Sequence, residues 1–379
     1  MPSEPRHPPI VPSYGSASLA DLSASVAAAV GIPSFHNTMG VTSARRACIL
    51  LIDGLGWEQL RDHPAAAPLL SELARSSRPI TAGYPATTVT SMASLCTGVP
   101  SGQHGMLGYQ VLIPGTSRML NGLRWDSRVD PLQWQPHPTI YERATDAGIP
   151  SFHVAQSSFR GTGLTNALMR GAEYIPADTM GALAAQTASV LAEYPRAYVT
   201  VYHGDLDATG HVFGVGSDAW FKQLAHVDKL AEHLASSLPP STVLYITADH
   251  GMVNAVPDER IDIDVVTALR DGVAVLGGEP RARHVYTRPG AAQDVLATWR
   301  EVLGDRAWVL PREDAIKEGW FGPVDPEFTE RIGDVVAAPA GSTALVATKA
   351  EPRESALFGM HGSLTPSDQL IPALAYPGA

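Results

Sequence analysis

The chain has 379 residues, of which 45% are hydrophobic, and its formal net charge is -11. This length allows two or three domains, or one large domain with an insertion, around a large buried core. Because an acidic surface repels a polyanionic backbone, we expect no binding to extended nucleic acid, although a small phosphorylated substrate can still enter a local metal-lined cleft.

Residues 1–40 are rich in proline, serine and alanine and predict a lead-in segment with one short helix. The apolar stretch at residues 17–30 is interrupted by Asp21 and several serines, so it predicts neither a secretory signal nor a membrane span. We therefore expect a cytoplasmic protein without a membrane partner. Cys48 and Cys96 fall in a predicted strand and a predicted helix, and two cysteines provide no disulfide framework.

Three apolar runs with strand-favouring residues end in carboxylates or imidazoles. ACILLIDGLG (residues 47–56) reaches Asp53, AYVTVYHGDLD (residues 197–207) reaches Asp207, and TVLYITADHG (residues 242–251) reaches Asp249 and His250. Such runs are typical of central parallel strands that open into loops. The polar residues are thus predicted at the carboxyl ends of strands.

Helical patterns lie between these runs. The clearest is at residues 217–238, which begins with a Ser-Asp N-cap signal and carries an apolar stripe at steps of three and four residues: Trp220, Leu224, Val227, Leu230 and Leu234. Strands alternating with such helices predict an α/β fold, with a doubly wound, mostly parallel sheet and helices on both faces. Ligands of such sheets bind beyond the carboxyl ends of the strands.

Residues 258–340 have a different pattern. It comprises a strand-like segment at residues 283–288, a helix at about 291–303 and an aromatic loop at 320–323. Because candidate ligands occur both before and after this stretch, we interpret it as a small α+β cap insertion. The predicted core then comprises residues 41–257 and 341–379, and we expect its sheet to resume near residues 342–349.

The side chains at these strand ends are of the types that hold two zinc ions. Asp207 and His211 are four residues apart, so both can face one ion, but His203 and Asp205 are nearby alternatives. Polar groups directly after a buried strand are costly without a metal or hydrogen bonds. His361 lies in the loop FGMHGSLTP, where glycines let the backbone come close to a ligand. The joint occurrence of six carboxylates and imidazoles predicts the site: Asp53, Asp207, His211, Asp249, His250 and His361.

A Thr-rich segment at residues 83–98 can supply a hydroxyl nucleophile that the metals activate. Together with this segment, the motifs LLIDGLG, LDATGHVFG, ITADHGM and GMHGSLTP resemble the alkaline phosphatase superfamily, most closely its type I phosphodiesterase/nucleotide pyrophosphatase family. The resemblance extends from about residue 47 to the end of the chain.

The resemblance implies a cofactor of two zinc ions, with manganese or iron as alternatives. One ion would be held by Asp53, Asp249, His250 and the nucleophile, and the other by Asp207, His211 and His361. The family nucleophile lies ten residues before the glycine of a Thr-Gly pair, which corresponds to Thr88 at the start of a helix. The neighbouring Thr87 and Thr90 are then expected to cap this helix or to pack in its first turn.

The activity implied is hydrolysis of a small phosphodiester or nucleotide-type pyrophosphate through a covalent phospho-Thr88 intermediate. A phosphomonoesterase, a phosphonate hydrolase or a phosphomutase would share the metals, whereas a sulfatase is disfavoured because Cys96 lacks the Cys-x-Pro-x-Arg context. A catalytically silent metal-binding scaffold is the alternative from another class, but a scaffold needs no hydroxyl at Thr88.

One residue and one three-residue segment differ from the family pattern. Tyr109 stands where the family usually has an Asn that contacts a phosphate oxygen, so it is a candidate substrate-binding residue. Val89, Thr90 and Ser91 replace the Phe-Pro-Asn that usually follows the nucleophile. These differences spare the predicted metal site and alter the predicted substrate contacts.

Overall fold

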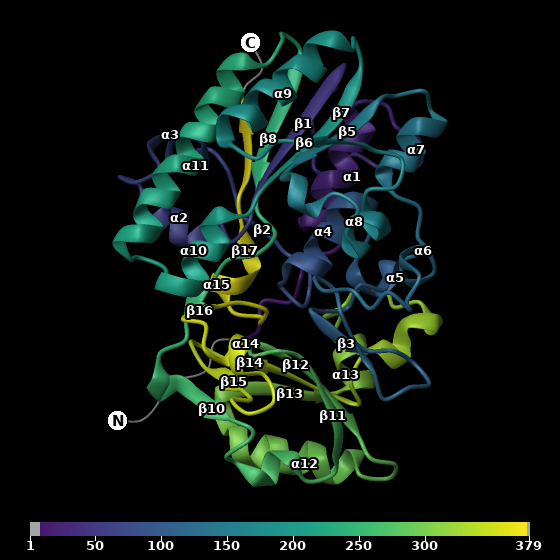
Figure 1. Ribbon diagram of the computed structural model, residues 1–379, viewed down its shortest axis with the longest axis vertical. Coiled ribbons are helices and arrows are strands. Elements are labelled where there is room, and N and C mark those ends of the chain that lie inside the picture. Colours follow the sequence, from purple (N-terminus) through teal and green to yellow (C-terminus); the bar gives the residue numbers. More distant parts are fainter. Residues whose placement is uncertain (1–7, 377–379) are drawn as a thin grey trace.

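The computed structural model describes residues 8–376 and is built around a six-stranded sheet (Figure 1). The strand order is β18-β8-β1-β7-β5-β6, and β18 alone runs antiparallel to its neighbour in this sheet. This arrangement confirms the predicted doubly wound, mostly parallel fold. Its strands are β1 (Arg46–Ile52), β5 (Ser151–Ala155), β6 (Glu173–Pro176), β7 (Ala197–His203), β8 (Thr242–Thr247) and β18 (Ala373–Tyr376).

The central strands are apolar because helices cover both faces of the sheet. In β1 every residue after Arg46 is buried, including Cys48, which carries a free thiol. Helices α9 (Met180–Glu193) and α11 (Asp218–Ser237) contact each other on one face, and α1 (Leu19–Ala29) and α4 (Thr88–Thr97) contact each other on the opposite face (Figure 1). This distribution follows from right-handed crossovers in both directions along the sheet.

The predicted amphipathic helix is α11. The Ser217 hydroxyl accepts a hydrogen bond from the Trp220 N–H, and all five residues of the predicted stripe are buried. The short helix predicted in the lead-in segment is α1, which begins with a capping box between Ser18 and Asp21. Residues 1–7 of that segment and residues 377–379 of the predicted core lie outside the described residues.

A second region lies at the lower end of the molecule in Figure 1. It contains a four-stranded antiparallel sheet with the order β11-β12-β14-β13 and helix α12 (Ala292–Leu303), and it has its own hydrophobic core around Trp299 and Val285. The strands are β11 (Val273–Glu279), β12 (Ala282–Thr287), β13 (Ala307–Pro311) and β14 (Val335–Pro339).

The main sheet does not resume at residues 342–349, which corrects one prediction. Strand β15 (Ala344–Val346) pairs in parallel with β10 (Arg260–Asp262), and Leu345 packs into the core of the second region. The main sheet is completed only by β18. The apolar run was read correctly as a strand, but a three-residue strand carries no information about which sheet it joins.

Shorter elements complete the fold. The remaining strands are β2 (Ile80–Thr81), β3 (Gln110–Leu112), β4 (Met119–Asn121), β9 (Val253–Asn254), β16 (Gly359–Met360) and β17 (Leu370–Ile371). The remaining helices are α2 (Trp57–Asp62), α3 (Pro68–Arg75), α5 (Ser101–His104), α6 (Pro131–Trp134), α7 (Ile140–Asp146), α8 (Gly163–Leu168), α10 (Asp205–Phe213), α13 (Arg312–Lys317), α14 (Pro352–Ser355) and α15 (Pro366–Gln369). No helix within residues 8–376 has the length and apolar character needed to cross a membrane.

Candidate active site

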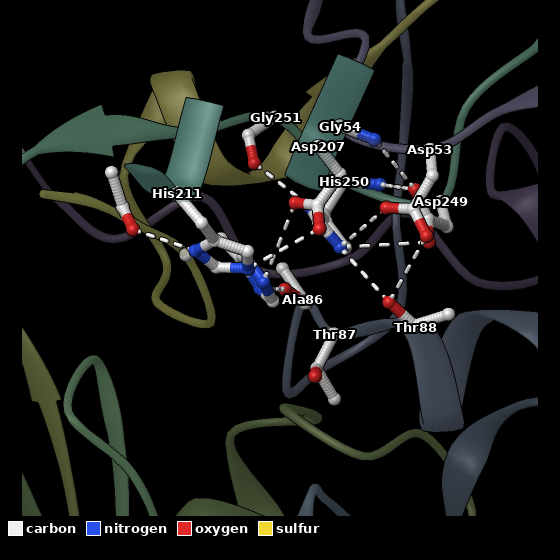
Figure 2. A network of polar contacts seen from close by, with 12 residues as sticks. Asp53, Gly54, Ala86, Thr87, Thr88, Asp207, His211, Asp249, His250 and Gly251 are labelled. Carbon is white, nitrogen blue, oxygen red and sulfur yellow. Dashed lines mark hydrogen bonds and ion pairs between the residues drawn. The ribbon is translucent and has the colours of Figure 1, made fainter. Parts of the chain in front are cut away.

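The six predicted metal-ligating side chains come from four segments that meet beyond the carboxyl ends of β1, β7 and β8 (Figure 2). Asp53 directly follows β1, and Asp249 and His250 follow β8. Asp207 and His211 lie on α10, and His361 directly follows β16. The close approach of the β1 loop to α10 requires a glycine, because a Cβ atom on Gly54 would lie 3.0 Å from the Cα of Asp207.

The nitrogens and carboxylate oxygens of this cluster lie close to one another. His250 Nε2 is 3.4 Å from Asp53 Oδ1 and 3.5 Å from Asp249 Oδ2. On the other side, Asp207 lies 3.2 Å from His211 Nε2 and 3.8 Å from His361 Nε2. The rings of His250 and His361 stack with their centroids 3.6 Å apart, so the two sides form one continuous cluster.

Each histidine of the cluster is oriented by a backbone carbonyl. Nδ1 lies 2.7 Å from the Gly359 oxygen in His211, 2.8 Å from the Gly251 oxygen in His250, and 3.0 Å from the Ala86 oxygen in His361. Since a carbonyl oxygen only accepts, Nδ1 is the protonated nitrogen in each ring. Nε2 of each ring therefore faces the carboxylates, and it is the nitrogen that can ligate a metal once it carries no proton.

The carboxylates are crowded and incompletely satisfied. Asp53 Oδ1, Asp207 Oδ1 and Asp249 Oδ2 are buried and have no hydrogen-bond partner within the described chain. Burial, together with the charge of Asp207, raises the pKa of Asp249 to about 7. Burial and the nearby carboxylates likewise raise the pKa of Asp53. Three buried oxygens without partners, close to the Nε2 atoms of three imidazoles, are a donor set that fits divalent cations.

The two halves of the cluster differ in charge. Burial alone would lower the pKa of His211, but the adjacent Asp207 raises it to about 9. Burial and the neighbouring His250 lower the pKa of His361. A proton shared by Asp207 and His211 therefore balances part of the negative charge, and a cation bound there would replace it.

Among residues 8–376, two groups of side chains have donor atoms close enough to hold an ion. One consists of Asp207, His211 and His361, which is the predicted second set. The other consists of Asp53, Asp207 and His250, so that Asp207 lies within reach of both positions. The alternatives His203 and Asp205 belong to neither group, since the His203 ring contacts Gln223 Nε2 at 3.3 Å and Asp205 at 3.8 Å.

Thr88 is the first residue of α4, which ends at Gly98 in the left-handed conformation. Its hydroxyl lies 3.4 Å from Asp53 Oδ2 and 3.4 Å from His250 Nε2 (Figure 2). Thr87 is the N-cap residue, but its side chain makes no capping hydrogen bond and donates to Glu279 Oε2 at 3.3 Å. Thr90 packs in the first turn as expected and donates to the Met106 carbonyl.

Two further residues complete the site, and sequence reasoning identified neither of them. The Tyr202 hydroxyl donates a short hydrogen bond to Asp53 Oδ2. Glu279, at the end of β11 in the second region, is buried beside Thr87 and His361, and burial raises its pKa to about 8. Tyr202 sits within an ordinary strand pattern and Glu279 is 82 residues before His361, so neither has a local sequence signal that marks it.

Two cavities open at Thr88. One, of about 210 Å³, is bordered by the charged or ionisable side chains of Asp207, His211, Glu279 and Glu354 and includes Tyr109. The Tyr109 hydroxyl donates to Glu354 Oε1 at 3.2 Å, and Arg124 approaches the same oxygen at 3.5 Å. The second cavity, of about 170 Å³, lies along α4 and α8 and is bordered mainly by apolar side chains. The predicted substrate residue thus lies at the site, engaged with a carboxylate.

Comparison with known proteins gives one family and several structural relatives. A family model described as type I phosphodiesterase / nucleotide pyrophosphatase matches residues 47–364. An inactive variant of murine ectonucleotide pyrophosphatase / phosphodiesterase 5, in complex with AMP, is 16% identical and superimposes with a TM-score of 0.69 over 88% of each chain. Its human counterpart is 18% identical, with a TM-score of 0.68 over 87% of each chain.

Another relative is phosphonoacetate hydrolase from Sinorhizobium meliloti 1021, in complex with phosphonoformate. It is 18% identical, has a TM-score of 0.69 and is matched over 89% of this chain and 92% of its own. At these identities the solved structures establish the shared fold. No curated protein matches the chain in sequence.

Proposed function

The chain belongs to the type I phosphodiesterase / nucleotide pyrophosphatase family, and on this premise we propose that it is a two-zinc hydrolase that cleaves a small phosphodiester or pyrophosphate through a covalent intermediate on Thr88. The family resemblance read from the motifs is thereby confirmed, and the chain is an enzyme of the metal-dependent hydrolase type. The observation that carries the proposal is the position of the Thr88 hydroxyl, 3.4 Å from both Asp53 and His250, at the edge of a donor set suited to two cations.

In this proposal, Asp53, Asp249, His250 and the Thr88 oxygen hold one ion. Asp207, His211 and His361 hold the other. When bound, two such ions supply Lewis-acid polarisation of the phosphoryl oxygens and lower the pKa of a coordinated hydroxyl. Manganese or iron in place of zinc would use the same residues.

The chain's own residues place the nucleophile. Thr88 is the first residue of a ten-residue helix, whose first N–H groups have no intrahelical partner and face a bound anion favourably. The hydroxyl loses its proton to solvent and forms a bond to phosphorus while the bond to the leaving oxygen breaks. The leaving oxygen takes up a proton. Water then attacks phosphorus from the side that the leaving group has vacated, opposite the Thr88 oxygen, and the bond between Thr88 and phosphorus breaks. The phosphorylated product is released, and the Thr88 oxygen regains a proton as the attacking water gives one up. Two successive displacements retain configuration at phosphorus.

A phosphonate hydrolase or phosphomonoesterase that uses the same site is the second candidate. The observation that favours it is structural: phosphonoacetate hydrolase matches as large a share of the chain as the phosphodiesterase relatives, at the same TM-score. We also propose that residues 258–340 act as a cap on the core, because Glu279 of strand β11 reaches the Thr88 cavity.

The test is hydrolysis of nitrophenyl phosphodiesters, monoesters and phosphonates by the zinc-loaded protein, with Thr88→Ala as the variant. We expect the variant to lose roughly a thousandfold or more in kcat, because no hydroxyl remains to attack phosphorus. Metal content measured by mass spectrometry should stay near two ions per chain, since the carboxylate and imidazole donors are intact.

Thr90→Ala is the matched control, because it removes a hydroxyl from the same helix that bonds only the Met106 carbonyl in the described chain. Its kcat should remain within a few-fold of wild type. Equal activity in Thr88→Ala and wild type would remove Thr88 from the mechanism. Two bound ions without turnover of any ester would favour the metal-binding scaffold.

A further inference from the structure

The second cavity at Thr88 has an unusual lining for a site that handles phosphate. It has a volume of about 170 Å³ and lies between α4, α8 and the end of β7. Its walls include Met92, Phe159, Leu164, Leu168 and Met169. It borders Thr88 directly, so a substituent attached to the phosphorus under attack can enter it.

Most of the polar groups on the walls are already engaged within the protein. The Thr162 hydroxyl donates to Thr165 Oγ1, and the Thr165 hydroxyl donates to the Phe159 carbonyl at 2.6 Å. The Tyr202 hydroxyl is held by Asp53, and His153 Nδ1 contacts Thr200 Oγ1 at 2.8 Å. A ligand with several hydrogen-bonding atoms would therefore lose its water contacts and find few partners here.

The size of the cavity limits its occupant. An apolar protein cavity of about 150 Å³ holds a molecule of benzene. A cavity of 170 Å³ therefore accommodates a phenyl ring or an alkyl chain of roughly six carbons. A base with its ribose is larger and carries polar edges that the Met92 and Leu168 side chains do not satisfy.

We propose that this cavity binds an apolar substituent of the substrate, so that the enzyme prefers phosphoesters carrying a short alkyl or aryl group over nucleotides. The inference rests on the proposed function, because it places that substituent on the phosphorus that Thr88 attacks. The hydrophobic effect supplies the selectivity: each methylene that enters the cavity removes apolar surface from water.

The experiment is a series of nitrophenyl phosphodiesters whose second substituent grows from methyl to hexyl and phenyl. The nitrophenyl ester of thymidine monophosphate is the competitor. We expect kcat/KM to rise by about fourfold for each added methylene and to level off near six carbons, where the cavity is full. The thymidine ester should be a poorer substrate than the phenyl ester.

Two variants connect this trend to the cavity. Leu164→Gln adds a polar group to a half-buried wall position and should flatten the dependence of kcat/KM on chain length. Leu132→Gln is the matched control, because Leu132 is exposed and lies outside the cavity lining. It should keep the wild-type dependence on chain length.

A binding measurement separates this inference from the proposed function. Alkylphosphonates of the same chain lengths, added to the zinc-loaded protein, should raise the melting temperature in the same order as the esters. Chain-length-dependent binding without turnover of any ester would support the cavity and overturn the proposed function. Turnover that is independent of chain length, or fastest with the thymidine ester, would overturn the apolar preference and leave the proposed function standing.

Discussion

The residues that build the metal cluster owe their geometry to partners in a second layer. Asp53 is approached by the Thr88 hydroxyl and by the Tyr202 hydroxyl at the same oxygen, Oδ2. Its other oxygen, Oδ1, has no hydrogen-bond partner within the described chain and lies 3.4 Å from His250 Nε2. Tyr202 therefore fixes the rotation of the carboxylate and directs the unpaired oxygen toward the imidazoles.

We predict that Tyr202→Phe weakens zinc binding by roughly 10- to 100-fold, because loss of this hydrogen bond leaves Asp53 free to rotate. The dissociation constants can be measured by competition with a chromophoric chelator. Tyr245→Phe, on strand β8 of the same sheet, is the control and should bind zinc as wild type does. Equal zinc affinity in Tyr202→Phe and wild type would contradict a positioning role for this hydroxyl.

At the residue scale, the metal-ligating residues could be predicted from the sequence, but the residues that orient them could not. Asp53, Asp249 and His250 were predictable because each follows a buried apolar strand, where an unpaired polar group is costly. Tyr202 was not predictable, since a tyrosine in a strand is ordinary and its hydrogen bond depends on the pairing of β7 with β1.

At the scale of elements, buried polar side chains join the second region to the core. His284 of β12 is buried, with Nε2 2.9 Å from the Leu107 carbonyl and Nδ1 accepting the Gly333 N–H at 3.1 Å. These two hydrogen bonds require a neutral imidazole, because protonation of Nδ1 would break the hydrogen bond from the Gly333 N–H. Burial lowers the pKa of His284 to about 4.

We predict that this histidine makes the protein less stable in acid. Its pKa is about 4 in the folded state and about 6.5 in the unfolded chain, so the unfolded chain binds the proton more readily. The contribution of neutral His284 to the free energy of unfolding is complete above pH 6.5 and is lost as the pH falls toward 4, by about 3 kcal/mol in total.

His284→Gln should show a smaller decrease in the free energy of unfolding between pH 7.5 and 5, measured by urea denaturation. An unchanged decrease in this variant, matching the exposed-site control His233→Gln, would contradict the prediction.

A buried ion pair holds the loop that carries His361. Arg281 donates from Nε and Nη2 to the two oxygens of Asp368, at 2.9 and 2.7 Å, and Asp368 also accepts the Ser363 N–H. We predict that Arg281→Met lowers the free energy of unfolding by about 3 to 5 kcal/mol, because it leaves the Asp368 charge buried without its partner.

Urea denaturation of Arg281→Met and of Arg270→Met provides the comparison. Arg270 pairs with Asp264 while 46% of its side chain is exposed, so its loss should cost less than about 1 kcal/mol. Similar losses in the two variants would show that burial of the Arg281 pair does not determine its contribution.

At the scale of the whole molecule, the order of strands and helices along the chain was predicted better than the pairing of strands and the packing of the two regions. Strand β1 and helix α11 follow from local periodicity and capping, whereas the start of α4 at Thr88 was predicted from the family resemblance. Strand β15 was assigned to the wrong sheet, because its three residues pair with β10 across more than 80 positions of chain. The contact of Glu279 with the site depends on how the second region packs against the core, which no local pattern encodes.

The metal cluster joins segments that are distant in the chain, so we expect bound zinc to stabilise the whole fold. In the absence of cations, Asp53 and Asp249 are buried close to each other, and burial raises the pKa of both. Zinc that binds only the folded chain adds about 4 kcal/mol when its concentration is a thousand times the dissociation constant. Removal of zinc by a chelator should therefore lower the melting temperature, measured by calorimetry, and restored zinc should recover it.

Asp207→Asn should melt close to the chelated wild type and respond weakly to zinc, because Asp207 lies within reach of both ion positions. A melting temperature that is unaffected by chelation, in protein shown by mass spectrometry to have lost its zinc, would mean that packing alone holds the four segments of the site together.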